Sequence, residues 1–141
     1  MTNFYVIMPV GADKYFEEKR SIIERVAQEE CLMPYFPYNR TGNVTFDIDS
    51  TLSRLRISRF VLADLSMERP SCYFELGLAQ AIGKDVYLIA AQGTAIHQAH
   101  GRNLTRFYNN LESYKNVISA VLKEAKQTER LILRSESLVA P

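Results

Sequence analysis

The sequence lacks the features of several protein classes. Its 141 residues contain only two cysteines, Cys31 and Cys72, which are too few for a disulfide framework and indicate a reduced, cytosolic setting. No apolar run approaches the length of a membrane span, and the first residues lack the basic start of a signal peptide. The formal net charge is only +1, so no bulk attraction favours nucleic acid or an anionic membrane surface. We therefore expect a cytosolic protein with neither as a partner.

Glycine is also scarce where a dinucleotide site would need it. Only Gly11 follows the first apolar run, whereas a dinucleotide fingerprint requires three spaced glycines after the first strand. The loop can still offer backbone amides to a sugar or a phosphate through Pro9 and Gly11, with Tyr15 near by. The equally good alternative is a plain turn in which Gly11 supplies a permissive backbone.

The apolar pattern that is present alternates between strands and helices. The predicted strands are 4–9, 32–38, 60–63, 86–90 and 104–108, and the predicted helices are 44–58, 71–82, 111–126 and one from about residue 13. Pro34 and Pro37 place the second strand at a sheet edge. This alternation predicts an α/β fold, a flavodoxin/Rossmann-like three-layer α-β-α domain with a five-stranded parallel sheet in the order 2-1-3-4-5.

The same pattern predicts the faces and ends of the helices. We expect one domain over residues 1–128 and a C-terminal tail over 129–141 that contacts the body or a second subunit. Gly83 is a suitable left-handed stop for the 71–82 helix. The residues expected to face inward are Ile48, Leu52 and Leu55 on one helix, and Phe74, Leu78 and Ala81 on another.

Two acids stand where an α/β unit builds active sites. Asp64 follows the strand 60–63 at its carboxyl end, where open α/β sheets bind ligands. Ser71 is predicted to cap the next helix, so that Glu75 lies in its first turn or just after it, where the helix dipole favours an ionised carboxylate. In the predicted strand order, the loop 9–12, the loop 64–66 with Ser66, and Glu75 share one crevice.

These segments resemble a known group of enzymes. Tyr5-Val-Ile-Met-Pro9, Ala63-Asp-Leu-Ser66 and above all Tyr73-Phe-Glu-Leu-Gly-Leu-Ala79 are similar to the nucleoside 2-deoxyribosyltransferase-like superfamily. The resemblance covers roughly residues 4–90. Bacterial Toll/interleukin-receptor-like (TIR-like) domains share a related sheet and a helix-borne glutamate, so the motif does not separate the two groups.

The resemblance implies roles for both acids. Glu75 would be the nucleophile that attacks the anomeric carbon of a nucleoside or nucleotide, and Asp64 would hold the sugar or assist proton transfer to the base. The chemistry agrees, because cleavage of an N-glycosidic bond builds positive charge on the sugar, which a fixed carboxylate stabilises or captures. The alternative is a solvated helix acid at Glu75 and a turn-capping acid at Asp64.

Further residues are candidates for substrate contact. His97 and Arg102 follow the fourth strand on the ligand side of the sheet, together with His100, and arginine matches phosphate oxygens. Tyr73 can stack on a base or fill the crevice wall. The histidines have no carboxylate or cysteine partner close in sequence, so we expect no metal, and no cofactor is implied. Arg106 is expected at the surface or an interface, and Glu68 either binds the sugar or faces water.

Cys72 permits a further alternative, a cysteine nucleophile activated at a helix start and paired with His97. A structural role as a small buried hydrophobe is the preferred interpretation.

Three functional hypotheses follow. The first is N-glycosidic cleavage or base transfer with a small nucleoside or nucleotide as partner. The second is a TIR-like module of anti-phage defence that processes NAD or a signal nucleotide, and the third is a non-catalytic nucleotide-binding module. The resemblance also implies a homo-oligomer, with Leu131–Leu133 and Phe107–Tyr108 as candidate contacts.

Overall fold

A five-stranded parallel sheet forms the centre of the molecule. The computed structural model describes residues 1–11, 13–37 and 47–139. The sheet order is β2-β1-β3-β4-β5, and all neighbouring strands run parallel. The strands are β1 (Thr2–Ile7), β2 (Leu32–Tyr35), β3 (Phe60–Asp64), β4 (Asp85–Ala91) and β5 (Arg106–Tyr108). The predicted fold class and strand order are confirmed, including β2 as an edge strand.

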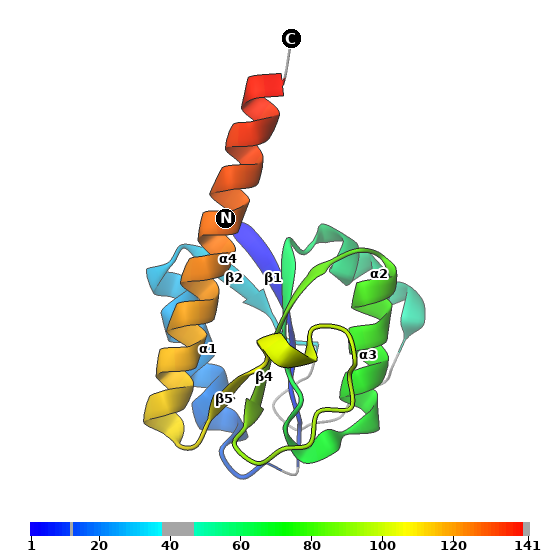
Figure 1. Cartoon of the computed structure of the whole chain (residues 1–141), viewed down its shortest axis with the longest axis vertical. Coiled ribbons are helices and arrows are strands. Elements are labelled where there is room, and N and C mark those ends of the chain that lie inside the picture. The colour runs from blue at the N-terminus through cyan, green and yellow to red at the C-terminus, as the bar shows by residue number, and fades with distance from the viewer. Residues whose placement is uncertain (12, 38–46, 140–141) are drawn as a thin grey trace.

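Helices cover both faces of this sheet and give the three predicted layers. They are α1 (Phe16–Glu29), α2 (Ile48–Ile57), α3 (Pro70–Ala81) and α4 (Leu111–Val139). In Figure 1, α1 and α4 lie on one side of the sheet, whereas α2 and α3 lie on the other. The connection 92–105 carries only a short 3-10 turn, Arg102–Leu104, and no α-helix.

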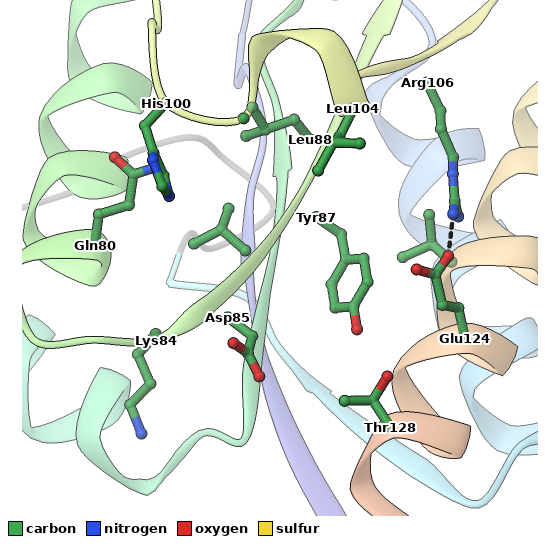
Figure 2. A pocket seen from close by; sticks show the side chains of 13 residues that line it. Gln80, Lys84, Asp85, Tyr87, Leu88, His100, Leu104, Arg106, Glu124 and Thr128 are labelled. Atoms are coloured by element: carbon green, nitrogen blue, oxygen red, sulfur yellow. Dashed lines mark hydrogen bonds and ion pairs between the residues drawn. The ribbon is translucent and has the colours of Figure 1, made fainter.

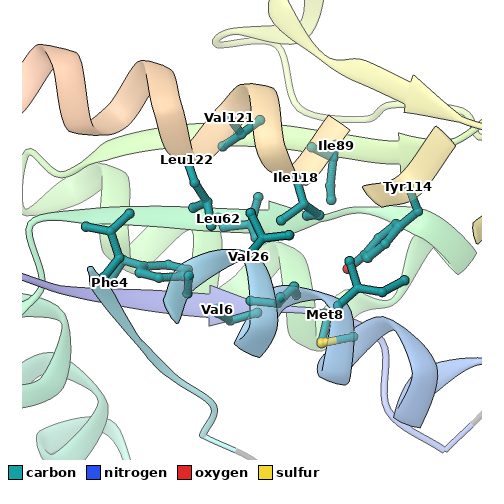
Figure 3. Packing of buried hydrophobic residues seen from close by; sticks show 14 of the residues in the cluster. Phe4, Val6, Met8, Val26, Leu62, Ile89, Tyr114, Ile118, Val121 and Leu122 are labelled. Atoms are coloured by element: carbon teal, nitrogen blue, oxygen red, sulfur yellow. The ribbon is translucent and has the colours of Figure 1, made fainter. Parts of the chain in front are cut away.

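Two apolar cores follow from the alternation of side chains along the strands. Phe4, Val6 and Leu62 point toward α1 and α4, where they meet residues such as Val26, Ile118 and Leu122 (Figure 3). Their neighbours in sequence point the other way, and Tyr5, Ile7, Val61 and Ala63 pack with α2 and α3. Because both faces are covered, the inner strands read as continuous apolar runs.

Several predicted details are wrong. The first helix begins at Phe16 rather than near residue 13. Ile48 is 45% exposed and Phe74 is 52% exposed, so neither belongs to the core. On α3 the buried face is instead formed by Cys72, Glu75, Leu76 and Ala79, and Ala81 is exposed. The start of the predicted 44–58 helix and the last residue of the predicted 32–38 strand lie outside the described residues.

The last helix is also longer than the predicted 111–126. Helix α4 continues without a break through residue 129 to Val139, and it projects beyond the body of the molecule (Figure 1). Every residue from Arg130 to Leu138 is exposed. Within the described residues, no helix is long and apolar enough to cross a membrane.

We predict that α4 stabilises the fold through its first half. Leu122 is fully buried, so Leu122→Ala should lower the free energy of unfolding by about 2–5 kcal/mol. Leu138 is 80% exposed on the same helix, and Leu138→Ala should change it by less than about 0.5 kcal/mol in a monomer. Urea denaturation followed by circular dichroism measures both, and equal effects would contradict the described packing.

Candidate active site

The carboxyl edge of the sheet brings the predicted loops together. β1 and β3 are neighbours, with Ile7 opposite Ala63, so the segments that follow them start side by side. The segment after β3 forms a short 3-10 turn, Ser66–Glu68, in which Met67 and Glu68 have φ values of 66° and 49°. Residues other than glycine rarely adopt positive φ values, and such backbone strain is typical of functional sites.

Helix α3 starts one residue earlier than predicted. Pro70 occupies the first helical position, a place that suits its fixed φ and missing N–H, and Arg69 is the N-cap residue. Ser71 therefore lies inside the first turn, and the prediction that it caps the helix is wrong. Glu75 lies in the second turn, beyond the reach of most of the helix dipole.

A tyrosine on the neighbouring strand binds the Glu75 carboxylate. The Tyr5 hydroxyl donates a hydrogen bond of 2.7 Å to Glu75 Oε2. Both residues are buried, with 5% of Glu75 exposed. Burial, followed by the charge of Glu75, raises the pKa of Tyr5 well above its usual value, so the phenol stays protonated and remains a donor.

Asp64 belongs to a second buried network. Its Oδ1 accepts the backbone N–H of Ser66 at 3.0 Å, and its Oδ2 accepts the Tyr108 hydroxyl at 2.7 Å. Burial raises the pKa of Asp64, and hydrogen bonds from Ser66 and Tyr108 together with the charge of Lys19 oppose that rise. The Ser66 hydroxyl is also committed within the protein, since it accepts the Ala91 N–H at 2.7 Å.

The two carboxyl groups lie on opposite faces of the sheet, near its carboxyl edge. Asp64 contacts Tyr108, a member of the core under α1 and α4, whereas Glu75 contacts Tyr5 of the core under α2 and α3. Both acids affect the Cys72 thiol: burial, then the charge of Glu75, then the charge of Asp64 raise its pKa to about 12. Such a thiol is protonated near neutral pH, which supports its structural interpretation.

A third cluster joins α3 to the loop after β4. The His97 N–H donates to the Tyr73 hydroxyl at 3.0 Å, and the His97 ring lies 2.5 Å from Glu68 Oε1 through Nε2. Glu68 therefore has a partner in His97. The structure thus joins two predicted contact residues, Tyr73 and His97, beside the loop that follows Asp64.

Other predicted contact residues are scattered. Pro9 is buried, Gly11 is exposed with a φ of 85°, and Tyr15 is the N-cap residue of α1 with 44% exposure. Arg102 is exposed, and its Nε donates to the Gln98 carbonyl at 3.1 Å. None of the described contacts links Arg102 to Asp64 or Glu75.

A cavity of about 460 Å³ lies away from the two acids. Figure 2 shows it between β4, the turn before β5 and α4. His100 lines this cavity, as does Arg106, which pairs with Glu124. It borders residues 84–88 at the start of β4, whereas Asp64 is at the end of β3. No group of three or more metal-ligating side chains occurs among the residues that the structure describes.

Three polar residues of the site were not predicted from the sequence: Tyr5, Lys19 and Tyr108. Lys19 offered a signal, because it falls on the apolar face of its helix with Phe16, Ile23 and Val26. Tyr5 belonged to a motif of the predicted resemblance but was given no role, and Tyr108 was predicted only as a candidate subunit contact.

Comparison with known proteins identifies the fold. No family model matches the chain, and no curated protein sequence matches it either. A CMP N-glycosidase from Clostridium botulinum is similar over 83% of this chain and 98% of its own, with a TM-score of 0.58 and 13% identity. A 2-deoxyribosyltransferase from Bacillus psychrosaccharolyticus is similar over 86% and 96%, with a TM-score of 0.60 and 16% identity. These likenesses show the fold, and it is the fold that the predicted resemblance to the nucleoside 2-deoxyribosyltransferase-like superfamily implies.

The fold is also present in larger proteins of other chemistry. The constitutive lysine decarboxylase of E. coli is similar over 91% of this chain but only 17% of its own, with a TM-score of 0.54 and 12% identity. Arguments about function must therefore come from the site.

We predict that the two cysteines differ sharply in reactivity. Cys31 is exposed and Cys72 is buried with a raised pKa. At about pH 8 a disulfide-exchange reagent should label Cys31 in the native protein and reach Cys72 only after denaturation. Cys31→Ser provides the control, since it should leave almost no native labelling. Rapid native labelling of Cys31→Ser would restore the cysteine-nucleophile alternative.

Proposed function

We propose that this chain cleaves the N-glycosidic bond of a nucleoside or nucleotide, or transfers its base, with Glu75 as the nucleophile. The observation that carries the proposal is the buried Glu75 carboxylate, bound by Tyr5 near the carboxyl edge of the sheet. The fold likeness to a CMP N-glycosidase and a 2-deoxyribosyltransferase supports the substrate class.

The reaction is a double displacement at the anomeric carbon. A Glu75 oxygen forms a bond to this carbon while the carbon–nitrogen bond breaks, and the base leaves with the electron pair and takes up a proton. Water or a second base then displaces Glu75. The donor at Tyr5 holds the carboxylate in one orientation, and the buried surroundings strengthen its attraction to the positive sugar.

In this proposal Asp64 acts at the same carboxyl edge of the sheet as Glu75, from the opposite face. It holds the sugar or assists proton transfer to the leaving base, from the end of the adjacent strand. The remaining candidate contacts are Pro9, Gly11, Tyr15, Ser66, Tyr73, His97 and Arg102. Of these, Tyr73 and His97 support each other directly across the loop after β4.

We predict that Glu75→Gln abolishes base release. The amide keeps the shape of the side chain but cannot act as the anionic nucleophile, so turnover should fall by about 10³-fold or more. The panel contains deoxynucleosides, their monophosphates, cytidine monophosphate and NAD, each with and without an acceptor base. Chromatography reports free or exchanged base, and intact mass reports a glycosyl adduct.

Glu112→Gln makes the same chemical change at an exposed acid of α4 and should behave as wild type. Release from NAD alone would point to the TIR-like alternative. Ligand binding without any base release would point to the binding module, and equal turnover by Glu75→Gln would overturn the role of Glu75.

We also propose that two copies of the chain associate through α4. Leu131 and Leu138 are exposed on its projecting half, at 67% and 80%. They continue the helical face of Glu124 and Thr128, which line the cavity beside β4. Antiparallel packing of two α4 helices near Thr128 would lay each projecting half over the partner's cavity, which makes the contact self-complementary. Phe107 is also exposed, whereas Tyr108 is buried within the subunit and is not a surface contact.

We predict that wild type is a dimer or larger in solution, and that the double change Leu131→Glu and Leu138→Glu yields a monomer, because it places charges in an apolar contact. Light scattering coupled to gel filtration measures the mass. Gln127→Glu adds a charge to an exposed position of the same helix and should leave the assembly intact. A wild type that is monomeric at micromolar concentration would contradict the proposal.

A further inference from the structure

A buried lysine takes no part in the chemistry proposed above. Lys19 is only 7% exposed, on the same side of α1 as the apolar residues that face the sheet. Burial of an ammonium group is costly unless hydrogen bonds and opposite charge compensate for it. Its Nζ donates to Asp13 Oδ2 at 2.6 Å and to the Tyr108 hydroxyl at 3.0 Å.

The Tyr108 hydroxyl is the junction between this lysine and Asp64. It receives the Lys19 hydrogen bond, donates to Asp64 Oδ2 at 2.7 Å and lies 2.9 Å from the Ser66 hydroxyl. A phenol has one proton, so when Tyr108 donates to Asp64 the Ser66 hydroxyl keeps its own proton for Tyr108 or for Asp64. The two hydrogen bonds from Lys19 to Tyr108 and from Tyr108 to Asp64 thus both run toward Asp64.

The titratable groups around Asp64 come from α1, α3, β5 and α4. Lys19 of α1 and Asp13 before it form one ion pair, Tyr108 comes from β5, and Tyr114 comes from α4. Cys72 of α3 lies within the influence of Asp64 as well. The hydrogen bonds from Ser66 and Tyr108 and the charge of Lys19 therefore all favour the ionised form of Asp64 against the effect of burial.

We propose that Tyr108 and Lys19 are positioning residues for Asp64: Lys19 fixes the Tyr108 hydroxyl, and Tyr108 fixes the Asp64 carboxylate near the carboxyl edge of the sheet. The catalytic consequence rests on the proposed function. Loss of the Tyr108 hydroxyl leaves Oδ2 of Asp64 without the donor that binds it at 2.7 Å, and the orientation of the carboxylate relative to a sugar or base changes.

The chain contains a matched control for this hydroxyl. The ring of Tyr114 meets that of Tyr108 edge-on, with centroids 4.8 Å apart, and Lys19 Nζ lies 5.5 Å from its centroid. The Tyr114 hydroxyl is buried and has no hydrogen-bond partner among the described residues. Tyr114→Phe therefore removes the same atom from the neighbouring ring without breaking the chain to Asp64.

The test is a titration of Asp64 by carboxyl-carbon NMR, with its signal assigned by its loss in Asp64→Asn. The Tyr108 hydrogen bond stabilises the charged form, so Tyr108→Phe should raise the pKa of Asp64 by about one unit or more. Lys19→Met should raise it too, whereas Tyr114→Phe should leave it near the wild-type value. If Lys19→Met does not fold, the comparison of the Asp64 pKa in Tyr108→Phe and Tyr114→Phe still tests the inference.

Kinetics of the same variants separate this inference from the proposed function. Tyr108→Phe should lower kcat by about 10- to 100-fold and move to higher pH the limb of the profile that Asp64→Asn removes. A titration shift without base release by wild type would refute the glycosidic chemistry and retain the positioning role. The inference would be overturned if wild type releases base and Tyr108→Phe has the same Asp64 pKa and the same kcat as Tyr114→Phe.

Discussion

The pairing of β1 with β3 is the constraint on which the candidate site depends. With Ile7 opposite Ala63, Tyr5 faces α3 and Asp64 faces α1 and α4. Side chains alternate along a strand, so a slip of β1 by one residue would turn Tyr5 away from Glu75, and a slip of β3 would turn Asp64 away from Tyr108. The apolar residues on both sides of the sheet oppose such a slip, because it would bury polar groups and expose the core.

Much of the fold was predictable because its signals are local or topological. Alternating strands and helices admit few arrangements of a sheet. In the order 2-1-3-4-5 the first and third strands are neighbours, so the loops 9–12 and 64–66 were expected to lie at one crevice. Glycine at 83 ends α3 with a φ of 79°, as predicted. The face of α3 was harder, because apolar residues occur around most of its circumference. Periodicity favoured Phe74 for the core, whereas the helix turns Glu75 inward to Tyr5.

The network at Asp64 could not be predicted in the same way, since its members come from parts of the chain far apart in sequence. Lys19 and Tyr108 are separated by 89 positions, and Tyr108 and Asp64 by 44. Only the lysine on an apolar face hinted at a buried partner. The Ser71 cap failed for a more local reason, because Pro70 already fixes the first turn of α3.

The fold by itself does not select a reaction, as the likeness to part of a lysine decarboxylase shows. The stronger argument lies in the separation of the two acids. Glu75 rests against the phenol of Tyr5 on one face, while Asp64 is held on the other by a backbone amide and a tyrosine that itself depends on a buried ion pair. Each acid thus has its own donors, and different donors and neighbouring charges give two carboxyl groups different pKa values. Unequal surroundings allow one acid to stay a fixed anion while the other exchanges a proton, and the proposed double displacement would use that division.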